Sequence, residues 1–448
     1  MRIGFGRQDI TPRVGVELCG FGPFRCRHSV AVRDRLWARA MALEHEGRRV
    51  VLLACDLIGV PLAITDAVRA RVQEQSGLPP ESLMLCCSHT HSGPAVGTYR
   101  GWGEADPPYC ETLPARLAQA VLRALADLAD GSLYYGEAPC EGIGLNREYD
   151  RDAPPLEEVL QDTWRPAHPE RTDTVCRVLE VRGADGRRRG FVSHFGCHPV
   201  TCCAATRAIH GDYCGVATNL LEREEPGSTG LFVQGAQGDV NSCVVHKPEP
   251  ESLLALDVVA GRYARAVRQA LSAAVPMPVA GLACVRERLV FTRKPWGAEE
   301  LRRRLRECEA FLHRPDAHDD FAEGSRNVRM ETVYALSLRA LLGRLERGED
   351  LATATEVMGL RLGPLTILGS GFETMQAIKN DVVAGARGPH TWVSSLTNDS
   401  TGYAPDRDVA ARGGYAADMV PLIIGTVPYA GIHDELVAAL LRLDRALE

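Results

Sequence analysis

Short apolar runs that stop abruptly at polar, glycine-rich or histidine-rich stretches recur along the chain. Each run is brief, almost uninterrupted and bounded by turn-forming residues, and we predict buried strands at 49–56, 83–87, 189–195 and 231–234. Elsewhere apolar residues recur at helical spacing, and we predict helices at 109–130, 254–274 and 433–447. Strands that alternate with helices indicate an α/β fold, in which functional side chains follow the strand ends.

Two segments interrupt this pattern. Residues 150–173 are rich in Pro, Asp and Glu, which predicts a long surface loop. Residues 315–326 separate two helical stretches, and we expect this segment to be the most mobile. Because neither segment is long enough to link independent domains, we predict one continuous domain over 1–448, with a β-sheet core flanked by helices.

The composition excludes several classes of partner. With 45% hydrophobic and 24% charged residues the chain is typical of a globular protein, and its 6% of aromatic residues predicts a mostly aliphatic core. A formal net charge of −7 argues against a nucleic-acid or anionic-membrane partner, because both attract basic surfaces. No apolar stretch approaches the roughly 20 residues that a membrane helix needs, so we expect no integral membrane segment.

The N-terminal residues and the cysteines predict a compartment. The chain opens without the apolar region of a signal peptide, and its 15 cysteines include no CxxC pair. In a chain without an export signal we expect such cysteines to be free, buried thiols. We therefore predict a cytoplasmic protein, and the sequence indicates no oligomeric state. Six cysteines near the motifs described next are expected to fill the core: Cys86, Cys87, Cys197, Cys202, Cys214 and Cys243.

The strongest local signal is the segment CSHTHSGP at 87–94, directly after a predicted strand. Two histidines two positions apart on an extended segment point to the same side, but their Cβ atoms are too widely spaced to share a metal unless the chain turns. One histidine as a metal ligand and the other as a proton carrier is one interpretation. A polar loop with two hydrogen-bonded imidazoles is the other.

Two further loops follow predicted strands. In SHFGCHP at 193–199, His198 precedes a proline, which favours an extended backbone suited to a metal ligand. In QGAQGDVN at 234–241, glycines bring backbone donors within reach of a ligand, although the lysine of a phosphate-binding loop is missing. A tight structural turn explains the second loop about as well. None of the three segments is decisive by itself.

Together with DITP at 9–12, the order SHTHSGP, CHP and QGxxGDV resembles the catalytic domain of neutral ceramidases. The resemblance extends from residue 9 to about residue 415, and RDRLWARA at 33–40 and Asp56 also match. It implies one zinc ion per chain, held by two histidines, a glutamate and a tyrosine. The matching positions here are His89, His198, Glu373 and Tyr403.

The same resemblance assigns further roles. It places His91 at a proton-transfer position, Tyr415 on the substrate side and Arg147 in the active site. Two histidines, a carboxylate and a phenolate suit Zn²⁺, which activates water and polarises a carbonyl group. His91 would then move protons, while Tyr415 and Arg147 would stabilise an oxyanion or hold the substrate. Asp239 and Asn241 are predicted to contact the substrate.

The sequence departs from the ceramidase pattern at four points. Asn241 replaces a serine, and Gly371-Phe372 replaces the Pro-Gly before Glu373. Because the chain ends at Glu448, we expect no C-terminal β-sandwich domain. Ceramidases also generally act outside the cytoplasm or at membrane surfaces, whereas nothing here indicates export. These differences weaken ceramide as the substrate more than they weaken a zinc hydrolase.

The resulting hypothesis is a zinc-dependent hydrolase that cleaves a linear amide in a small N-acylated substrate. One alternative is a ceramidase proper, acting on N-acylsphingosine, although the sequence shows no clear amphipathic entry helix. An esterase or lactonase is chemically close and is not distinguished by these residues. A non-catalytic binding protein on the same fold is the alternative from another class, and the presence of all four ligand positions disfavours it.

Overall fold

The computed structural model describes residues 1–150, 154–319 and 326–447, and its centre is a large mixed β-sheet. Six consecutive strands of this sheet, from β9 to β4, pair antiparallel with one another, whereas the edge strands β5 and β11 pair in parallel with β4 and β9. In spatial order the strands are β11 (Thr229–Gln234), β9 (Arg188–Phe195), β8 (Val175–Gly183), β6 (Ala129–Pro139), β1 (Arg2–Asp9), β3 (Trp37–His45), β4 (Arg48–Cys55) and β5 (Leu83–Cys87), with β13 (Val275–Pro276) paired to β6.

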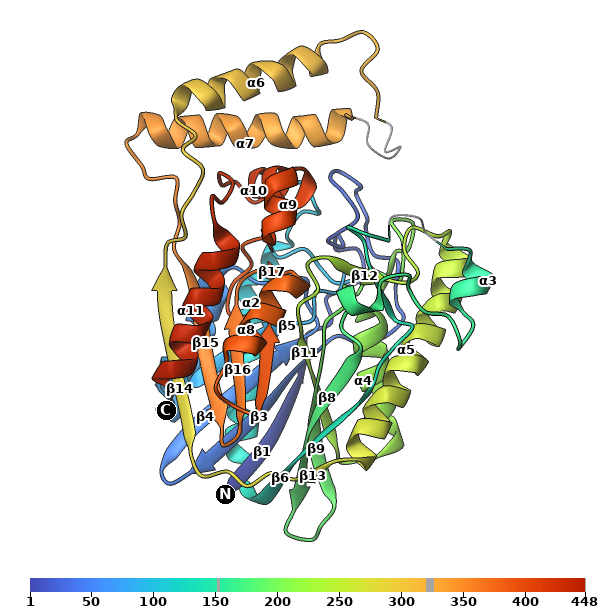
Figure 1. The fold of residues 1–448 in the computed structure, drawn as a ribbon, viewed down its shortest axis with the longest axis vertical. Helices are drawn as coiled ribbons and strands as arrows, with labels where there is room; N and C mark the ends of the chain where they lie inside the picture. The colour runs from blue at the N-terminus through green and yellow to red at the C-terminus, as the bar shows by residue number, and fades with distance from the viewer. Residues whose placement is uncertain (151–153, 320–325, 448) are drawn as a thin grey trace.

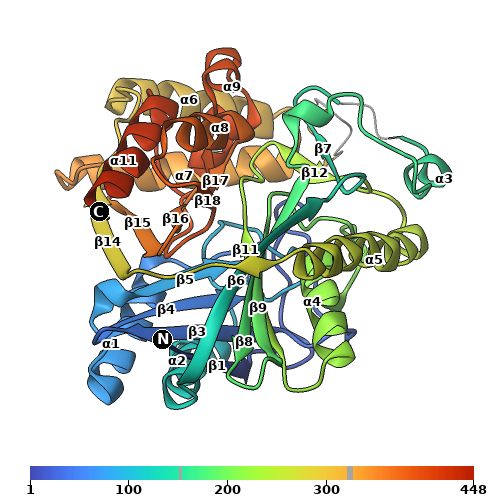
Figure 2. The same cartoon turned by 60° about the horizontal axis from the view of Figure 1, so that its bottom comes forward.

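A second sheet packs face to face on the first, so the molecule has four layers (Figure 2). Alternate residues of the large sheet, such as Met41 and Leu179, meet Met358 and Trp392 of the second sheet in one apolar cluster. The prediction of an α/β chain with a β-sheet core is confirmed, and the second sheet is an addition to it. Its strands are β14 (Leu282–Leu289), β15 (Thr355–Leu362), β16 (Leu365–Ser370) and β18 (His390–Ser394).

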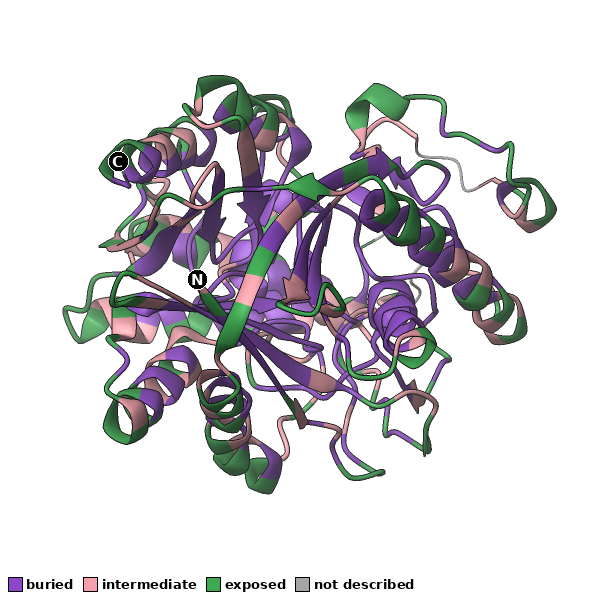
Figure 3. Ribbon diagram, turned by 90° about the horizontal axis from the view of Figure 1, so that it is seen from below, coloured by how far each residue is buried: buried purple, intermediate pink, exposed green. Residues whose placement is uncertain are grey.

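Helices cover the outer faces of both sheets, and their exposed sides form the rim of the molecule (Figure 3). The large sheet is covered by α1 (Leu62–Ser76), α2 (Pro107–Ala126), α4 (Asp212–Glu224) and α5 (Glu249–Ser272). The second sheet is covered by α8 (Gln376–Gly385) and α11 (Ile432–Ala446). Within the described residues, no helix is long and apolar enough to cross a membrane.

Two long helices, α6 (Ala298–Leu312) and α7 (Val328–Glu346), lie side by side across one end of the molecule (Figure 1). Helix α7 packs on the short helix α10 (Val420–Ile423), beside α9 (Arg407–Arg412) and the π-turn Tyr415–Met419. The remaining small elements are α3 (Leu156–Val159), the 3-10 turns Pro80–Ser82 and Pro169–Arg171, and the two-stranded ladders β2 (Ala31–Val32) with β10 (Ala208–Ile209), β7 (Gly144–Asn146) with β12 (Val240–Ser242), and β17 (Glu373–Thr374) with β19 (Tyr403–Ala404).

The structure places strands at all four predicted positions and helices at all three, with changed ends. The helix predicted at 109–130 ends at Ala126, because the Asp127 carboxylate accepts a hydrogen bond from Phe5 N and the next residues begin β6. Within 150–173, the described residues contain α3 and a 3-10 turn. Residues 151–153, and 320–325 of the segment expected to be mobile, lie outside the described residues.

Candidate metal centre

His89 and His91 follow the end of β5, and the chain turns between them. The φ angle of His89 is +72°, in the left-handed region that few residues other than glycine adopt. This turn brings Nε2 of His91 to 3.3 Å from Nε2 of His89. The spacing problem foreseen for an extended His-Thr-His segment is therefore removed by one residue of left-handed backbone.

The rings of His89 and His198 are oriented by backbone carbonyl groups. Nδ1 of His89 donates to Ile58 O at 2.6 Å, and Nδ1 of His198 donates to Gln237 O at 2.6 Å. Both histidines are 2% exposed. Since a carbonyl only accepts, these bonds place the proton on Nδ1 and leave the Nε2 lone pair free, as in most metal-ligating histidines.

Glu373 and Tyr403 enter the site together because β17 and β19 pair in parallel with these two residues in register. Oε2 of Glu373 lies 3.2 Å from Nε2 of His89 and 3.0 Å from Nε2 of His198. The hydroxyl of Tyr403 lies 3.4 Å from Nε2 of His198. The four predicted ligand residues, separated by up to 314 positions in sequence, thus converge on one point.

The distances within this cluster fit a single zinc ion. Donor atoms about 2.0–2.1 Å from a tetrahedral ion lie about 3.3 Å apart, close to the 3.0–3.4 Å found here. Oε2 of Glu373 is buried and accepts no hydrogen bond from the described residues. A buried carboxylate oxygen without a hydrogen bond is stabilised by a nearby cation. The imidazole, carboxylate and phenol groups of this set are suitable ligands for Zn²⁺.

The electrostatics of the cluster follow from its burial. Burial lowers the pKa of His198 to about 4, and it lowers the pKa of His91 well below the ordinary range with help from His89 and His198. Burial acts to raise the pKa of Glu373, but His89 and His198 together hold it well below the usual value. Neutral imidazoles beside an ionised carboxylate are the protonation states that a metal ion requires.

His91 differs from the two ligand histidines in one respect. Its Nδ1 is buried and makes no hydrogen bond to the described residues, whereas a ligand histidine almost always donates from its second nitrogen. Its ring meets the edge of Phe21, with ring centroids 5.2 Å apart. His91 lies beside the metal centre, but it lacks the support that holds His89 and His198.

A second group of possible metal ligands lies nearby and is less suitable. Cys202, His210 and Asp212 are buried with their ligand atoms within 4.8 Å of one another. However, Nδ1 of His210 accepts a hydrogen bond from Asp212 N at 3.1 Å, so the proton of the neutral ring is on Nε2. A ring in this state has no free lone pair to offer, which leaves the first cluster as the candidate centre.

Arg147 and Tyr415 flank Tyr403. The guanidinium of Arg147 lies 4.8 Å from the centre of the Tyr403 ring, and its Nη2 donates to Gly238 O at 2.7 Å. The Tyr415 ring lies 6.2 Å from the Tyr403 ring, and Tyr415 is 45% exposed. Burial raises the pKa of Tyr403 well above its usual value, but the Arg147 cation acts against this and favours the phenolate.

The loop 234–241 packs next to the proposed ligand residues and is held in place by hydrogen bonds of Asp239. Asp239 is buried, and its two carboxylate oxygens accept hydrogen bonds from Asn146 Nδ2 at 2.8 Å and Gln376 N at 2.9 Å. Asn241 lies in β12, opposite Leu145 of β7. Neither Asp239 nor Asn241 lines the cavity at the metal centre, so their contact with a substrate stays a prediction.

The cavity at the metal centre has a volume of about 40 Å³. Sequence reasoning missed half of its lining, because the sequence around these apolar and aromatic residues does not show whether their side chains face the core, the surface or a cavity. Among the missed residues is Tyr99, whose hydroxyl donates to Oε1 of Glu373 at 3.3 Å and lies 3.0 Å from Oγ of Ser400. The lining residues are Ile58, His89, His91, Tyr99, Trp102, Glu373, Tyr403, Tyr415, Val420 and Ile423.

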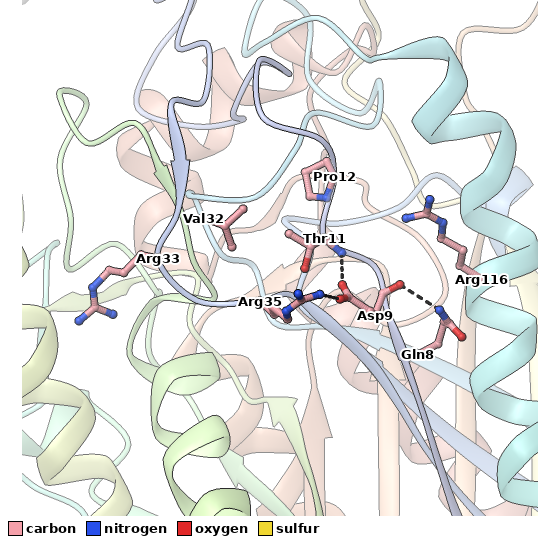
Figure 4. A pocket seen from close by; sticks show the side chains of 8 residues that line it. All are labelled: Gln8, Asp9, Thr11, Pro12, Val32, Arg33, Arg35 and Arg116. Carbon is pink, nitrogen blue, oxygen red and sulfur yellow. Dashed lines mark hydrogen bonds and ion pairs between the residues drawn. The ribbon is translucent and has the colours of Figure 1, made fainter.

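Larger hollows exist on the surface, but they are unlike a catalytic site. One of about 720 Å³ is lined by Asp9 and three arginines together with four uncharged residues (Figure 4): Gln8, Asp9, Thr11, Pro12, Val32, Arg33, Arg35 and Arg116. Arg35 is paired with Asp9, and Arg33 with Asp257. None of the predicted site residues lines it, so we assign function to the small cavity where the ligand atoms converge. The six cysteines near the motifs are buried and do not line that cavity.

The chain is similar to known ceramidases in sequence. It is 26% identical over 261 residues to a neutral ceramidase of Pseudomonas aeruginosa, covering 55% of this chain and 38% of that protein. It is also 26% identical over 263 residues to neutral ceramidase A of Dictyostelium discoideum, covering 54% of this chain and 35% of that protein. The match thus spans well under half the length of these relatives.

Solved structures share the fold over the whole chain. The crystal structure of neutral ceramidase from Pseudomonas aeruginosa superposes with a TM-score of 0.73 at 21% identity, covering 100% of this chain and 75% of that chain. A ceramidase complexed with C2 gives a TM-score of 0.75 at 20% identity with the same coverage. The mixed α/β domain with a large central sheet is therefore the fold of these proteins.

A family model ties the sequence motifs to this fold. The model described as neutral/alkaline non-lysosomal ceramidase, N-terminal, matches residues 1–245, which is more than half of the 448 residues. The matched region contains His89, His91, Arg147 and His198. On this evidence the chain belongs to the neutral/alkaline non-lysosomal ceramidase family.

Proposed function

We propose that the protein is a zinc-dependent hydrolase that cleaves the linear amide bond of a small N-acylated substrate. The observation that carries this proposal is the convergence of the side chains of His89, His198, Glu373 and Tyr403, with donor atoms 3.0–3.4 Å apart. The names of the related ceramidases support an amide as the bond that is cleaved.

His89, His198, Glu373 and Tyr403 would hold the ion. Zn²⁺ in this set would supply Lewis-acid chemistry, polarising a carbonyl group and acidifying water. The carbonyl groups of Ile58 and Gln237 keep the two imidazoles in the tautomer that binds metal. Arg147, stacked on Tyr403, favours the ionised phenol that a zinc ligand requires.

His91 is proposed to carry protons. Its Nε2 faces the cluster, 3.3 Å from Nε2 of His89, and its ring lines the cavity. It would take the proton that the attacking water releases and give it to the amide nitrogen, because an amine leaves readily only after protonation. Tyr415, at the exposed side of the same cavity, would donate its hydroxyl hydrogen to the developing oxyanion.

The test is the metal content of the purified protein, measured by elemental mass spectrometry on wild type, His198→Ala and His91→Ala. We expect about one zinc per chain in wild type and in His91→Ala. We expect His198→Ala to lose most of it, since the variant lacks a ligand. With zinc restored, wild type should hydrolyse simple N-acyl amides, and His91→Ala should be slower by roughly 10²–10⁴-fold.

Two results would contradict the proposal. Wild-type protein that stays free of zinc after incubation with the metal would remove the mechanism and favour a binding protein on this fold. Zinc loss in His91→Ala equal to that in His198→Ala would instead make His91 a ligand and refute its role as a proton carrier. As a control, His194→Ala should keep its zinc, because His194 Nε2 bonds Val393 O outside the cluster.

A further inference from the structure

The cavity at the metal centre is closed on one side by an apolar wall. Ile58, Trp102, Val420 and Ile423 line it, and all four are buried. The rest of the lining is imidazole, carboxylate and phenol. The apolar part of the lining belongs to a single core cluster, so a substrate bound at the ion would meet polar ligand groups and one apolar surface.

The segments that carry the apolar wall are held by hydrogen bonds and by packing on α7. Arg100 N donates to Ile423 O at 3.1 Å, and Trp102 N donates to Tyr99 O at 3.3 Å, so the loop that carries Trp102 is tied to α10. Helix α10 in turn packs on α7, within an apolar cluster that includes Leu338 and Leu341. In Figure 1, α6 and α7 lie beyond α10 as an outer layer. The wall is thus the surface of a packed apolar cluster.

The space in front of the wall is small. The cavity of about 40 Å³ compares with roughly 10–15 Å³ needed for one water molecule, and its lining includes the proposed metal ligands, so beside an ion it holds at most about three non-hydrogen atoms. That is the size of an acetyl group. A longer chain would have to displace close-packed side chains, which is costly because protein interiors have few voids.

Of the residues that line the cavity, Tyr415 alone is exposed, so the open side lies there. Tyr415 is 45% exposed and Met419, four residues later, is 41% exposed. A polar amine loses little hydration on the open side, whereas an alkyl group gains most against the apolar wall. The two substituents of the amide are thereby sorted, with the acyl group inward and the amine outward.

We propose that the protein is selective for amides with a short acyl group, of the acetyl class, on a larger amine. This inference rests on the proposed function and adds the identity of the group removed. Val420, Ile423 and Trp102 are the residues that set the length limit.

The experiment measures kcat/KM of the zinc-loaded enzyme on amides of 4-nitroaniline, with straight acyl chains from acetyl to dodecanoyl, and on acetyl and palmitoyl ceramide. We expect kcat/KM to fall by about tenfold or more between acetyl and hexanoyl, since one misplaced methylene already costs about tenfold. Palmitoyl ceramide should be hydrolysed far more slowly than acetyl ceramide.

A matched pair of variants tests the wall itself. Ile423 lines the cavity, whereas its neighbour Leu422 is buried in the same helix and does not line it. We expect Ile423→Ala to move the preferred acyl group to butyryl or longer. Leu422→Ala should keep the acetyl preference, although it removes a similar volume from the same element. Zinc content should be the same in both.

Three outcomes separate the hypotheses. Palmitoyl ceramide hydrolysed as fast as acetyl ceramide by wild type overturns the short-acyl inference and leaves the amidase intact. Equal shifts in chain-length preference for Ile423→Ala and Leu422→Ala also overturn it, because the effect would then be general loosening. No turnover of any amide by zinc-loaded wild type overturns the proposed function, and the inference with it.

Discussion

Tyr99 shows how one side chain sets the direction of a metal ligand. Its hydroxyl holds Oε1 of Glu373, so the other carboxylate oxygen points at the two histidines. Ser400 steadies the same hydroxyl from the other side. Partners of this kind orient a ligand before the ion arrives and reduce the entropy lost on binding.

We therefore expect Tyr99→Phe to keep its fold and to bind zinc about tenfold more weakly or worse, since loss of such partners typically costs 10–100-fold. Competition with a chromophoric chelator measures this affinity. Tyr109→Phe is the matched control, because the Tyr109 hydroxyl donates to Ile10 O at 2.8 Å away from the site. Equal weakening in both variants would show that Tyr99 acts only through general stability.

His194 gives a prediction for stability at acidic pH. Burial lowers its pKa from 6.5 to about 4, with Arg177 adding to the effect. The unfolded chain takes up a proton below pH 6.5 and the folded chain does not, so stability is full above pH 6.5 and is lost as pH falls toward 4.

This linkage amounts to about 3–4 kcal/mol at most, since each pKa unit is worth about 1.4 kcal/mol. Urea unfolding across this pH range should show wild type losing stability relative to His194→Gln, whose amide can still donate to Val393 O. Parallel curves for the two proteins would contradict the assigned pKa.

At this scale the sequence predicted residue types better than their geometry. The His-Thr-His segment and the histidine before Pro199 were compatible with a metal site but not decisive alone, and the set of ligands was predicted from the resemblance of the motif order to neutral ceramidases. The left-handed backbone at His89 was not predictable, because it depends on the loops packed around it. Tyr99 was missed because a tyrosine in a glycine-rich loop is equally compatible with a surface position.

Among the elements, the pairing of β17 with β19 determines that Glu373 and Tyr403 lie next to each other in the site. These strands have two residues each, yet their register sets Glu373 beside Tyr403. Gly238 allows the loop after β11 to approach this ladder, since a Cβ at that position would lie 2.5 Å from Glu373 O. Its own N–H donates to Thr374 O at 2.8 Å.

Gly238→Ala should therefore push β17 outward, weaken zinc binding and lower the free energy of unfolding by about 1–3 kcal/mol. Gly261→Ala is the control, because a Cβ there meets nothing within 4 Å in the middle of α5. That substitution should leave zinc affinity unchanged and stabilise the helix by up to about 1 kcal/mol. Calorimetric zinc titration and chemical denaturation distinguish the two.

Elements with a strong local pattern were predictable, and those defined by distant partners were not. The apolar runs of β4, β5, β9 and β11 and the periodicity of α2, α5 and α11 are visible in the sequence. The ladders β7 with β12 and β17 with β19 are too short for any periodicity, and the second sheet arises from pairings such as β16 with β18. Pairing of this kind is settled by tertiary packing.

On the scale of the whole molecule, α7 connects α6 to the site, because it packs on α6 and on α10, and α10 lines the cavity. Leu338 on its inner face is fully buried, whereas Leu336 on the same helix is 40% exposed. We expect Leu338→Ala to lower the free energy of unfolding by about 2–5 kcal/mol through the cavity it leaves. Leu336→Ala should change it by less than about 0.5 kcal/mol. Denaturant titration followed by tryptophan fluorescence measures both.

Because the four proposed ligands come from different parts of the fold, a bound ion would also affect the stability of the protein. His89 and His198 follow strands of the large sheet, whereas Glu373 and Tyr403 lie in the ladder of β17 and β19, whose strands come after β16 and β18 of the second sheet. Zinc bound to all four would clamp the two sheets together at one end, so that folding and metal binding become linked equilibria. The melting temperature should then rise with free zinc, by the equivalent of about 2.7 kcal/mol at a hundred times the dissociation constant. A melting temperature indifferent to chelators would mean that the sheets hold their positions without help from the metal.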